Sequence, residues 1–298
     1  MFSGADVVAL RQKTGAGVLD CKKALTETNG DMEKAVDLLR EKGIATAAKK
    51  SSRIAAEGIV AAKVEGNTGV LVEVNCETDF VAKGDQYKEF VDSVAEYVLA
   101  NDVKDAEALI EAKKDETIAA TAKIGEKIAI RRFAKITTCE NGIVETYIHG
   151  GGKVGVMVEL VGCTCDVAKA LAHDLALQIA AAKPLYLVPA DVPAEVIEHE
   201  KEILLAQIKN DEKMANKPAQ IIEKMVEGKV GKYYIENCLM NQAFVKDPSM
   251  TIEKVVKDAG VSMGKELTVK GFVRFEMGEG LEKKNEDFAA EVEAQMKK

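Results

Sequence analysis

The middle of the chain contains an internal repeat, and this repeat restricts the possible folds more than any other feature of the sequence. Residues 58–60 and 69–74 are apolar runs separated by a glycine-containing turn, and residues 142–144 and 155–160 repeat the pattern. Apolar runs joined by short glycine-rich turns are typical of antiparallel hairpins. Internal self-similarity indicates two copies of one supersecondary unit. The sequence therefore predicts two related lobes.

An amphipathic helix and a further strand follow each predicted hairpin. Apolar residues recur at helical spacing over 87–99 in the first lobe and over 168–179 in the second. The stretches 127–133 and 269–275 each supply one more strand pattern. This order of elements predicts an α+β fold with an antiparallel sheet in each lobe.

A small helical domain is expected before the first lobe. Residues 4–42 predict three short helices; glycines end the first two, and Asp31 can cap the third. We expect the third helix to end before Gly43, and the stretch 45–53 to form a polar linker that could itself be helical.

A helical insertion interrupts the second lobe before its last strand, and no strand signal is expected there. Two apolar helical patterns, 193–208 and 219–226, flank a break at Pro218 and predict a helical hairpin. Such a hairpin could mediate dimerisation or docking, or pack back on its own lobe.

These patterns divide the chain into domains. The predicted boundaries are 1–52 for the N-terminal domain with its linker, 53–140 and 141–280 for the two core subdomains, about 191–228 for the hairpin, and 281–298 for a C-terminal helical module.

The composition argues against several classes of protein. Acidic residues outnumber basic ones by 49 to 41, which disfavours a nucleic-acid binder but not a protein partner. We find no apolar run near the roughly 18 residues of a membrane span and no signal peptide, so we expect a cytoplasmic protein. The six cysteines lack framework spacing and are expected to be reduced.

Three patterns resemble catalytic or metal sites, and none supports that chemistry. Gly150–Lys153 lacks the Walker spacing and lies between two strands, so we expect a hairpin turn. Cys163–Cys165 with His173 lacks two further zinc ligands, so we expect buried thiols. Cys139 near His149 lacks an orienting group and an oxyanion site. We expect no enzyme activity, no metal and no cofactor.

The strongest functional signal comes directly after the first predicted hairpin. Thr78, Asp79, Phe80 and Val81 lie between a strand pattern and a helical run. Thr78 or Asp79 could cap a helix with Phe80 as its first core residue. Alternatively, Phe80 could be an exposed contact residue beside a carboxylate. The local pattern leaves both interpretations open.

Six separated motifs, spread in order over nearly the whole chain, resemble the bacterial elongation factor Ts family of nucleotide-exchange factors. The motifs occupy residues 10–25, 74–83, 147–150, 155–158, 244–248 and 271–276. This resemblance implies a three-helix ubiquitin-associated-like domain, two related core subdomains, a helical dimerisation hairpin and a C-terminal module. It also implies a partner, the GTPase elongation factor Tu.

The resemblance further implies how the chain would act on that GTPase. Asp79 and Phe80 would enter it near its magnesium site and promote release of GDP, so that GTP can rebind. The implied contact residues are Thr78, Asp79, Phe80 and Val81 in this wedge, and Arg11, Val18, Leu19 and His149 outside it. A homodimer through the hairpin is possible, whereas direct binding of nucleotide or nucleic acid is not expected. The residues alone favour an adaptor that leaves nucleotide exchange unchanged.

Overall fold

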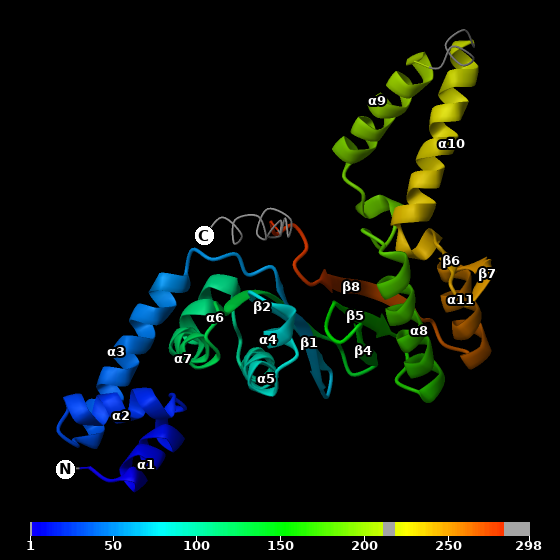
Figure 1. Cartoon of the computed structure of the whole chain (residues 1–298). Coiled ribbons are helices and arrows are strands. Elements are labelled where there is room, and N and C mark those ends of the chain that lie inside the picture. The colour runs from blue at the N-terminus through cyan, green and yellow to red at the C-terminus, as the bar shows by residue number, and fades with distance from the viewer. Residues whose placement is uncertain (1, 211–217, 283–298) are drawn as a thin grey trace.

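The computed structural model describes residues 2–210 and 218–282 (Figure 1). A helical N-terminal domain lies at one end, two sheets with covering helices lie in the middle, and a helical hairpin projects from the other end. Most of the predicted C-terminal module, residues 283–298, falls outside the described residues. Within the described part of the chain, no helix has both the length and the apolar character needed to span a bilayer.

The N-terminal domain consists of three helices, as predicted. Its elements are α1 (Gly4–Thr14), α2 (Val18–Glu27) and α3 (Met32–Lys50). Ser3 and Asp6 form a capping box at the start of α1. Leu10 and Leu25, together with smaller apolar residues, fill the space between the helices.

The third helix is longer than predicted. It continues through Gly43 to Lys50, so the expectation that it ends before Gly43 is wrong. Tertiary packing stabilises this extension, because a Cβ at Gly43 would lie only 3.6 Å from the Cβ of Ala122 on α7 (Lys114–Ile124). Arg40 pairs with Asp115 across the same contact. The contact with α7 outweighs the weak helix propensity of glycine.

The first lobe is an antiparallel sheet covered by helices. Its strands lie in the order β1-β2-β3. The elements are β1 (Glu57–Glu65), β2 (Thr68–Cys76), α4 (Asp79–Ala82), α5 (Asp85–Ala100), α6 (Ala106–Ala112), α7 and β3 (Ala129–Thr137). The predicted apolar stripe of α5 packs on this sheet through Tyr87, Val91, Val94 and Val98.

The second lobe repeats this plan. Its sheet has the order β4-β5-β8, again antiparallel, and α8 covers it. The bounds are β4 (Gly142–His149), β5 (Val154–Val161), α8 (Asp166–Ala182) and β8 (Thr268–Glu276). Leu171, Leu175 and Ile179 of α8 enter the core. The α+β class and the repeat are confirmed.

The two sheets pack directly against each other. Val60, Leu71, Met157 and Phe275 share one apolar cluster between the lobes. The Val60 N–H also donates a hydrogen bond of 2.7 Å to the carbonyl oxygen of Gly152 in the β4–β5 turn. The lobes therefore form one continuous packed unit.

The excursion between α8 and β8 is larger than predicted. It contains η1 (Pro189–Asp191), α9 (Ala194–Asn210), α10 (Ala219–Asn237), η2 (Leu239–Asn241), β6 (Ala243–Phe244), β7 (Asp247–Thr251) and α11 (Ile252–Met263). The expectation of no strand in this region is wrong, because β6 pairs with β7. The helix expected to end at Val226 continues to Asn237, since Val226, Val230 and Tyr234 form an uninterrupted stripe facing α9. The hairpin points away from its own lobe (Figure 1).

Candidate partner-binding site

The site begins where β2 ends, in a loop held by one glutamate. Glu126 Oε2 accepts hydrogen bonds from the N–H groups of Glu77 at 3.1 Å and Thr78 at 3.0 Å. Its Oε1 accepts a third, of 2.8 Å, from Thr78 Oγ1. Thr78 in turn caps α4, because its Oγ1 accepts from the Val81 N–H at 3.3 Å. These bonds fix the direction in which α4 leaves the sheet.

A second set of contacts holds the same loop from its other side. The carboxylate of Glu77 accepts a 2.6 Å hydrogen bond from the Lys127 N–H and pairs with Arg53 at 3.2 Å. Arg53 precedes β1, and Lys127 precedes β3. The loop is therefore tied to both segments that enter the neighbouring strands.

Phe80 points away from this anchored loop. Ala82 is buried and Val81 is half-buried against the core of the first lobe, whereas Phe80 is 84% exposed. The alternative in which Phe80 is the first core residue of the helix is wrong. Val81 and Ala82 perform that packing, and the one-turn helix leaves Phe80 on its outer side.

Asp79 is an exposed carboxylate beside this ring. It forms an ion pair of 2.6 Å with Lys83, one helical turn later. The hydrogen bond from Lys83 and the charge of that lysine lower the pKa of Asp79, and the charge of Lys153 lowers it further. Asp79 is therefore ionised at neutral pH. Lys153 belongs to the β4–β5 turn, so the second lobe borders the site.

His149 directly precedes the same turn. Gly150–Lys153 connects β4 to β5, which confirms the predicted hairpin turn. His149 is exposed at the end of β4, and its Nδ1 lies 3.0 Å from the Tyr147 hydroxyl. The structure thus places this end of the second hairpin, with His149 at its base, on the same side as the 78–81 segment.

The contact residues predicted in the N-terminal domain lie elsewhere. Arg11 is exposed on α1, and Val18 and Leu19 begin α2 with exposed fractions of 49% and 71%. Helices α1 and α2 occupy the far end of the molecule from the second lobe, and α3 connects them to the core (Figure 1). These residues form a surface separate from the one at 78–81.

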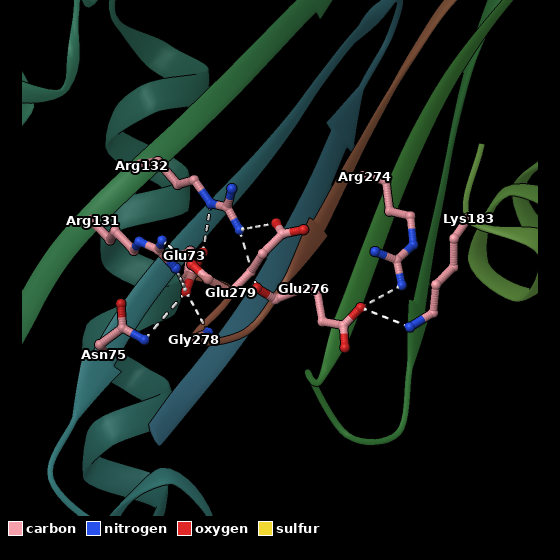
Figure 2. Close-up of polar contacts among 9 residues, drawn as sticks. All are labelled: Glu73, Asn75, Arg131, Arg132, Lys183, Arg274, Glu276, Gly278 and Glu279. Carbon is pink, nitrogen blue, oxygen red and sulfur yellow. Dashed lines mark hydrogen bonds and ion pairs between the residues drawn. The ribbon is translucent and has the colours of Figure 1, made fainter. Parts of the chain in front are cut away.

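The structure also shows a buried charge cluster that the sequence analysis missed. Glu73 on β2 is fully buried. Its Oε1 accepts hydrogen bonds from Arg131 at 2.9 Å and from the Gly278 N–H at 2.8 Å (Figure 2). Its Oε2 accepts a hydrogen bond of 2.6 Å from Arg132. Burial opposes ionisation of this carboxyl, but the hydrogen bonds from Gly278 and both arginines outweigh it and lower the pKa of Glu73. A lone glutamate between valines at 72 and 74 is the sequence signal for it.

This cluster joins the two lobes. Arg132 donates to the Glu276 carbonyl oxygen at 3.1 Å and lies over the Phe275 ring, 4.3 Å from its centroid. Glu276 itself pairs with Arg274 at 2.8 Å and Lys183 at 3.1 Å (Figure 2). The end of β8 is therefore attached to the sheet from which the 78–81 segment emerges.

The cysteines and histidines of the three rejected patterns lie in different elements, except that Cys163 and Cys165 are neighbours before α8. All six cysteines, which lie among the described residues, are free. Cys163 is half-buried and Cys165 is exposed, so the expectation of buried thiols there is wrong. His173 pairs with Glu145 at 2.9 Å, and Cys139 is exposed after β3. The short loop before α8 does not carry these thiols into the core.

Comparisons with known proteins agree with these observations. The family model described as elongation factor TS matches residues 77–279. Elongation factor Ts of Symbiobacterium thermophilum is 53% identical, with 96% of this chain and 95% of the relative covered. The proteins of the same name from Clostridium novyi and Nitratiruptor are 49% and 47% identical, each with 99% coverage of both chains. The chain therefore belongs to the elongation factor Ts family, the non-catalytic nucleotide-exchange factors of elongation factor Tu.

Proposed function

We propose that this protein releases GDP from elongation factor Tu by inserting Asp79 and Phe80 beside the magnesium site of the GTPase, so that GTP can rebind. The observation that carries this proposal is the exposure of Phe80, 84%, on a turn whose backbone is held by Glu126. Thr78 shapes the turn as its cap, and Val81 anchors it to the core.

The energetics of such a wedge can be stated from general physical chemistry. Mg²⁺ is often the largest local charge in a nucleotide site, so displacing its ligands weakens the bound nucleotide. Burying a phenylalanine side chain in a partner contributes roughly 1.5–3 kcal/mol. That free energy stabilises the displaced state of the partner. Because the coupling is reciprocal, GTP binding weakens the attachment of the factor in turn.

The anchoring of the loop supports this role. Ordering a flexible loop on binding would consume part of the interaction free energy. Here the hydrogen bonds that the carboxylates of Glu126 and Glu77 accept already order the loop in the free protein. The free energy of burying Phe80 is therefore available to deform the partner.

We assign Arg11, Val18, Leu19 and His149 to additional contacts with the same GTPase. His149 ends β4, next to the turn whose Lys153 acts on Asp79, whereas the other three lie on α1 and α2 of the N-terminal domain. Two separate contact surfaces on one chain raise the overall affinity, since the second contact becomes intramolecular once the first has formed.

We also infer that the protruding hairpin can form a homodimer. Apolar side chains of α9 and α10 remain exposed at Ile203, Leu205 and Ile221, although Ile208 and Val226 are buried between the helices. Sedimentation equilibrium would test this; an Ile203→Glu/Ile221→Glu variant should be monomeric where the wild type self-associates. A wild type that is monomeric at all concentrations would contradict it.

The chain itself is proposed to bind neither nucleotide nor nucleic acid. Calorimetric titration of the isolated protein with GDP should give no binding heat, and measurable affinity would refute this part of the proposal. The family consists of translation factors, in agreement with the cytoplasmic location expected from the sequence.

The decisive experiment measures release of fluorescent GDP from elongation factor Tu by stopped flow. Wild-type protein should accelerate release, and an Asp79→Ala/Phe80→Ala variant should lose most of that acceleration. Val167→Ala is a matched control, because Val167 is also apolar and exposed, at 54%, just after the central strand of the second lobe. Equal acceleration by the wild type and the double variant would move the mechanism to other contacts.

A further inference from the structure

The second lobe contains a cluster of sulfur atoms remote from the proposed partner-binding site. Cys163 and Cys165 lie between β5 and α8, at the opposite end of β5 from the turn that borders Asp79. The Cys165 thiol lies 3.2 Å from Sδ of Met263, the last residue of α11. Cys163 Sγ accepts a 3.2 Å hydrogen bond from the Cys165 N–H. Three sulfur-bearing side chains therefore meet at one place on the surface.

Backbone packing fixes the two loops that supply these sulfurs. Gly162 has a φ of +128°, and a Cβ there would overlap the carbonyl oxygen of Glu266. The loop before α8 therefore lies directly against the loop after α11. Cys163 and Met263 are half-buried against the core of the second lobe. The sulfurs are thus held by a packed framework.

We propose that Cys163, Cys165 and Met263 form a binding site for a soft monovalent metal ion, Cu(I). Thiolate and thioether sulfurs are the ligands that select Cu(I) over harder cations. Two sulfurs that are each about 2.3 Å from one ion can be at most about 4.6 Å apart. The 3.2 Å between Cys165 Sγ and Met263 Sδ lies within that limit.

The ligand set disfavours zinc. Structural zinc sites use four Cys or His ligands in a tetrahedron. Among residues 2–210 and 218–282, no group of three or more His, Cys, Asp or Glu side chains is placed to hold a metal. The third sulfur here comes from Met263, and a thioether is outside the set of Cys, His and Asp/Glu ligands that hold zinc in proteins.

The electrostatics of the loop favour the thiolate that a metal requires. Cys165 is the N-cap residue of α8, and a helix N-terminus favours the thiolate form of a cysteine. Binding releases the two thiol protons to solvent. The two thiolates, one thioether and Cu(I) then carry a net charge of −1, which remains partly exposed to water at Cys165.

The test is a competition for Cu(I) supplied as its bathocuproine disulfonate complex, under anaerobic conditions without added thiols. The wild-type protein should withdraw one equivalent of copper and reduce the visible absorbance of the complex. Cys163→Ser, Cys165→Ser and Met263→Leu should each weaken copper binding by more than about tenfold. Mutation of a residue that only supports the ligands already lowers metal affinity by about that factor.

Cys139 provides the matched control, because it is an exposed free thiol elsewhere on the surface. Cys139→Ser should bind copper as the wild type does, and circular dichroism should show that all variants are folded. X-ray absorption at the copper edge should find three sulfur neighbours in the wild type and two in Met263→Leu. Failure of the wild type to take copper, or unchanged binding in Met263→Leu, would overturn the proposal.

Discussion

The two lobes share a strand order, a covering helix and a central-strand irregularity, yet they differ in the connection that leaves the central strand. After β2, the chain forms the capped turn of α4 and exposes Phe80 before α5 begins. After β5, it passes through Cys163–Cys165 directly into α8. The same connection of a repeated fold thus carries the proposed protein-contact segment in one lobe and a sulfur cluster in the other. The sheets provide the scaffold, and the connections provide the specific chemistry.

A second difference concerns one glutamate at corresponding positions. Glu73 and Glu159 both precede a register shift in the central strand of their sheet. The residue opposite Glu73 on β3 is Arg132, whereas the residue opposite Glu159 on β8 is Gly271. Glu73 is consequently buried in an ion cluster, while Glu159 is half-buried and accepts one hydrogen bond of 2.7 Å from Thr138. The cross-strand neighbour decides which glutamate joins the lobes.

The largest expected effect is therefore a loss of free energy of unfolding when Glu73 is replaced. Glu73→Ala removes the buried acceptor that two arginines and the Gly278 N–H share. Removing one partner of a buried ion pair costs about 3–5 kcal/mol, and the partial exposure of both arginines puts the expected loss near the lower limit. Glu159→Ala should cost only about 1 kcal/mol. Urea unfolding measures both, and equal losses would show that the two glutamates are equivalent.

The next effect concerns activity rather than stability. Phe80→Ala should slow GDP release from elongation factor Tu by roughly 10–100-fold, the equivalent of roughly 1.5–3 kcal/mol of lost burial. Its free energy of unfolding should change by no more than about 0.5 kcal/mol, because the ring is exposed in the free protein. Val167→Ala should change neither quantity. A strongly destabilised Phe80→Ala variant would mean that the ring packs within the first lobe.

A smaller effect is expected from the N-terminal surface. Val18→Ser/Leu19→Ser removes two exposed apolar side chains from α2 and should weaken binding to elongation factor Tu by about tenfold. Maximal GDP release at saturating factor should stay close to wild type, because the 78–81 segment is intact. Titration of the release rate against factor concentration separates the two quantities. A lowered maximal rate would show that this domain takes part in the deformation itself.

The smallest expected effect is a pH dependence of the stability that the buried Glu73 cluster contributes. Because the pKa of Glu73 is lowered in the folded protein, its stabilising contribution is fully present above the ordinary glutamate pKa of about 4.3. That contribution is lost as the pH falls through the folded value. Urea midpoints between about pH 6 and 3 should fall less steeply in Glu73→Gln than in the wild type. Parallel curves would exclude a special role for this carboxylate in acid unfolding.

Much of this architecture could be predicted from local sequence. The repeated hairpins, the stripes of α5 and α8 and the N-terminal helices depend on periodicity and turn residues, and these features were predicted correctly. The extension of α3 beyond Gly43 depends on α7, and the extension of α10 depends on its pairing with α9. Packing between distant segments decides where such helices end, and the local sequence pattern does not show that packing.

The candidate site shows the same division. The sequence identified residues 78–81 but left open whether Phe80 was core or surface, since both interpretations share one helix signal. The answer depends on Glu126, 48 residues from Thr78. The contact of Cys165 with Met263 spans 98 residues, and that of Glu73 with Gly278 spans 205. Interactions at these separations arise only when the strands have assembled.

The buried cluster at Glu73 has a mechanical consequence for an exchange factor. When two bodies press on each other, the more compliant one is displaced. Glu73 attaches the end of the second sheet to the first, and the packed contact between Val60 and Gly152 resists sliding of one sheet over the other. The two sheets, held together in this way, keep Phe80 and His149 at a constant spacing while the partner binds. Under the proposed mechanism, the displacement then occurs in the GTPase.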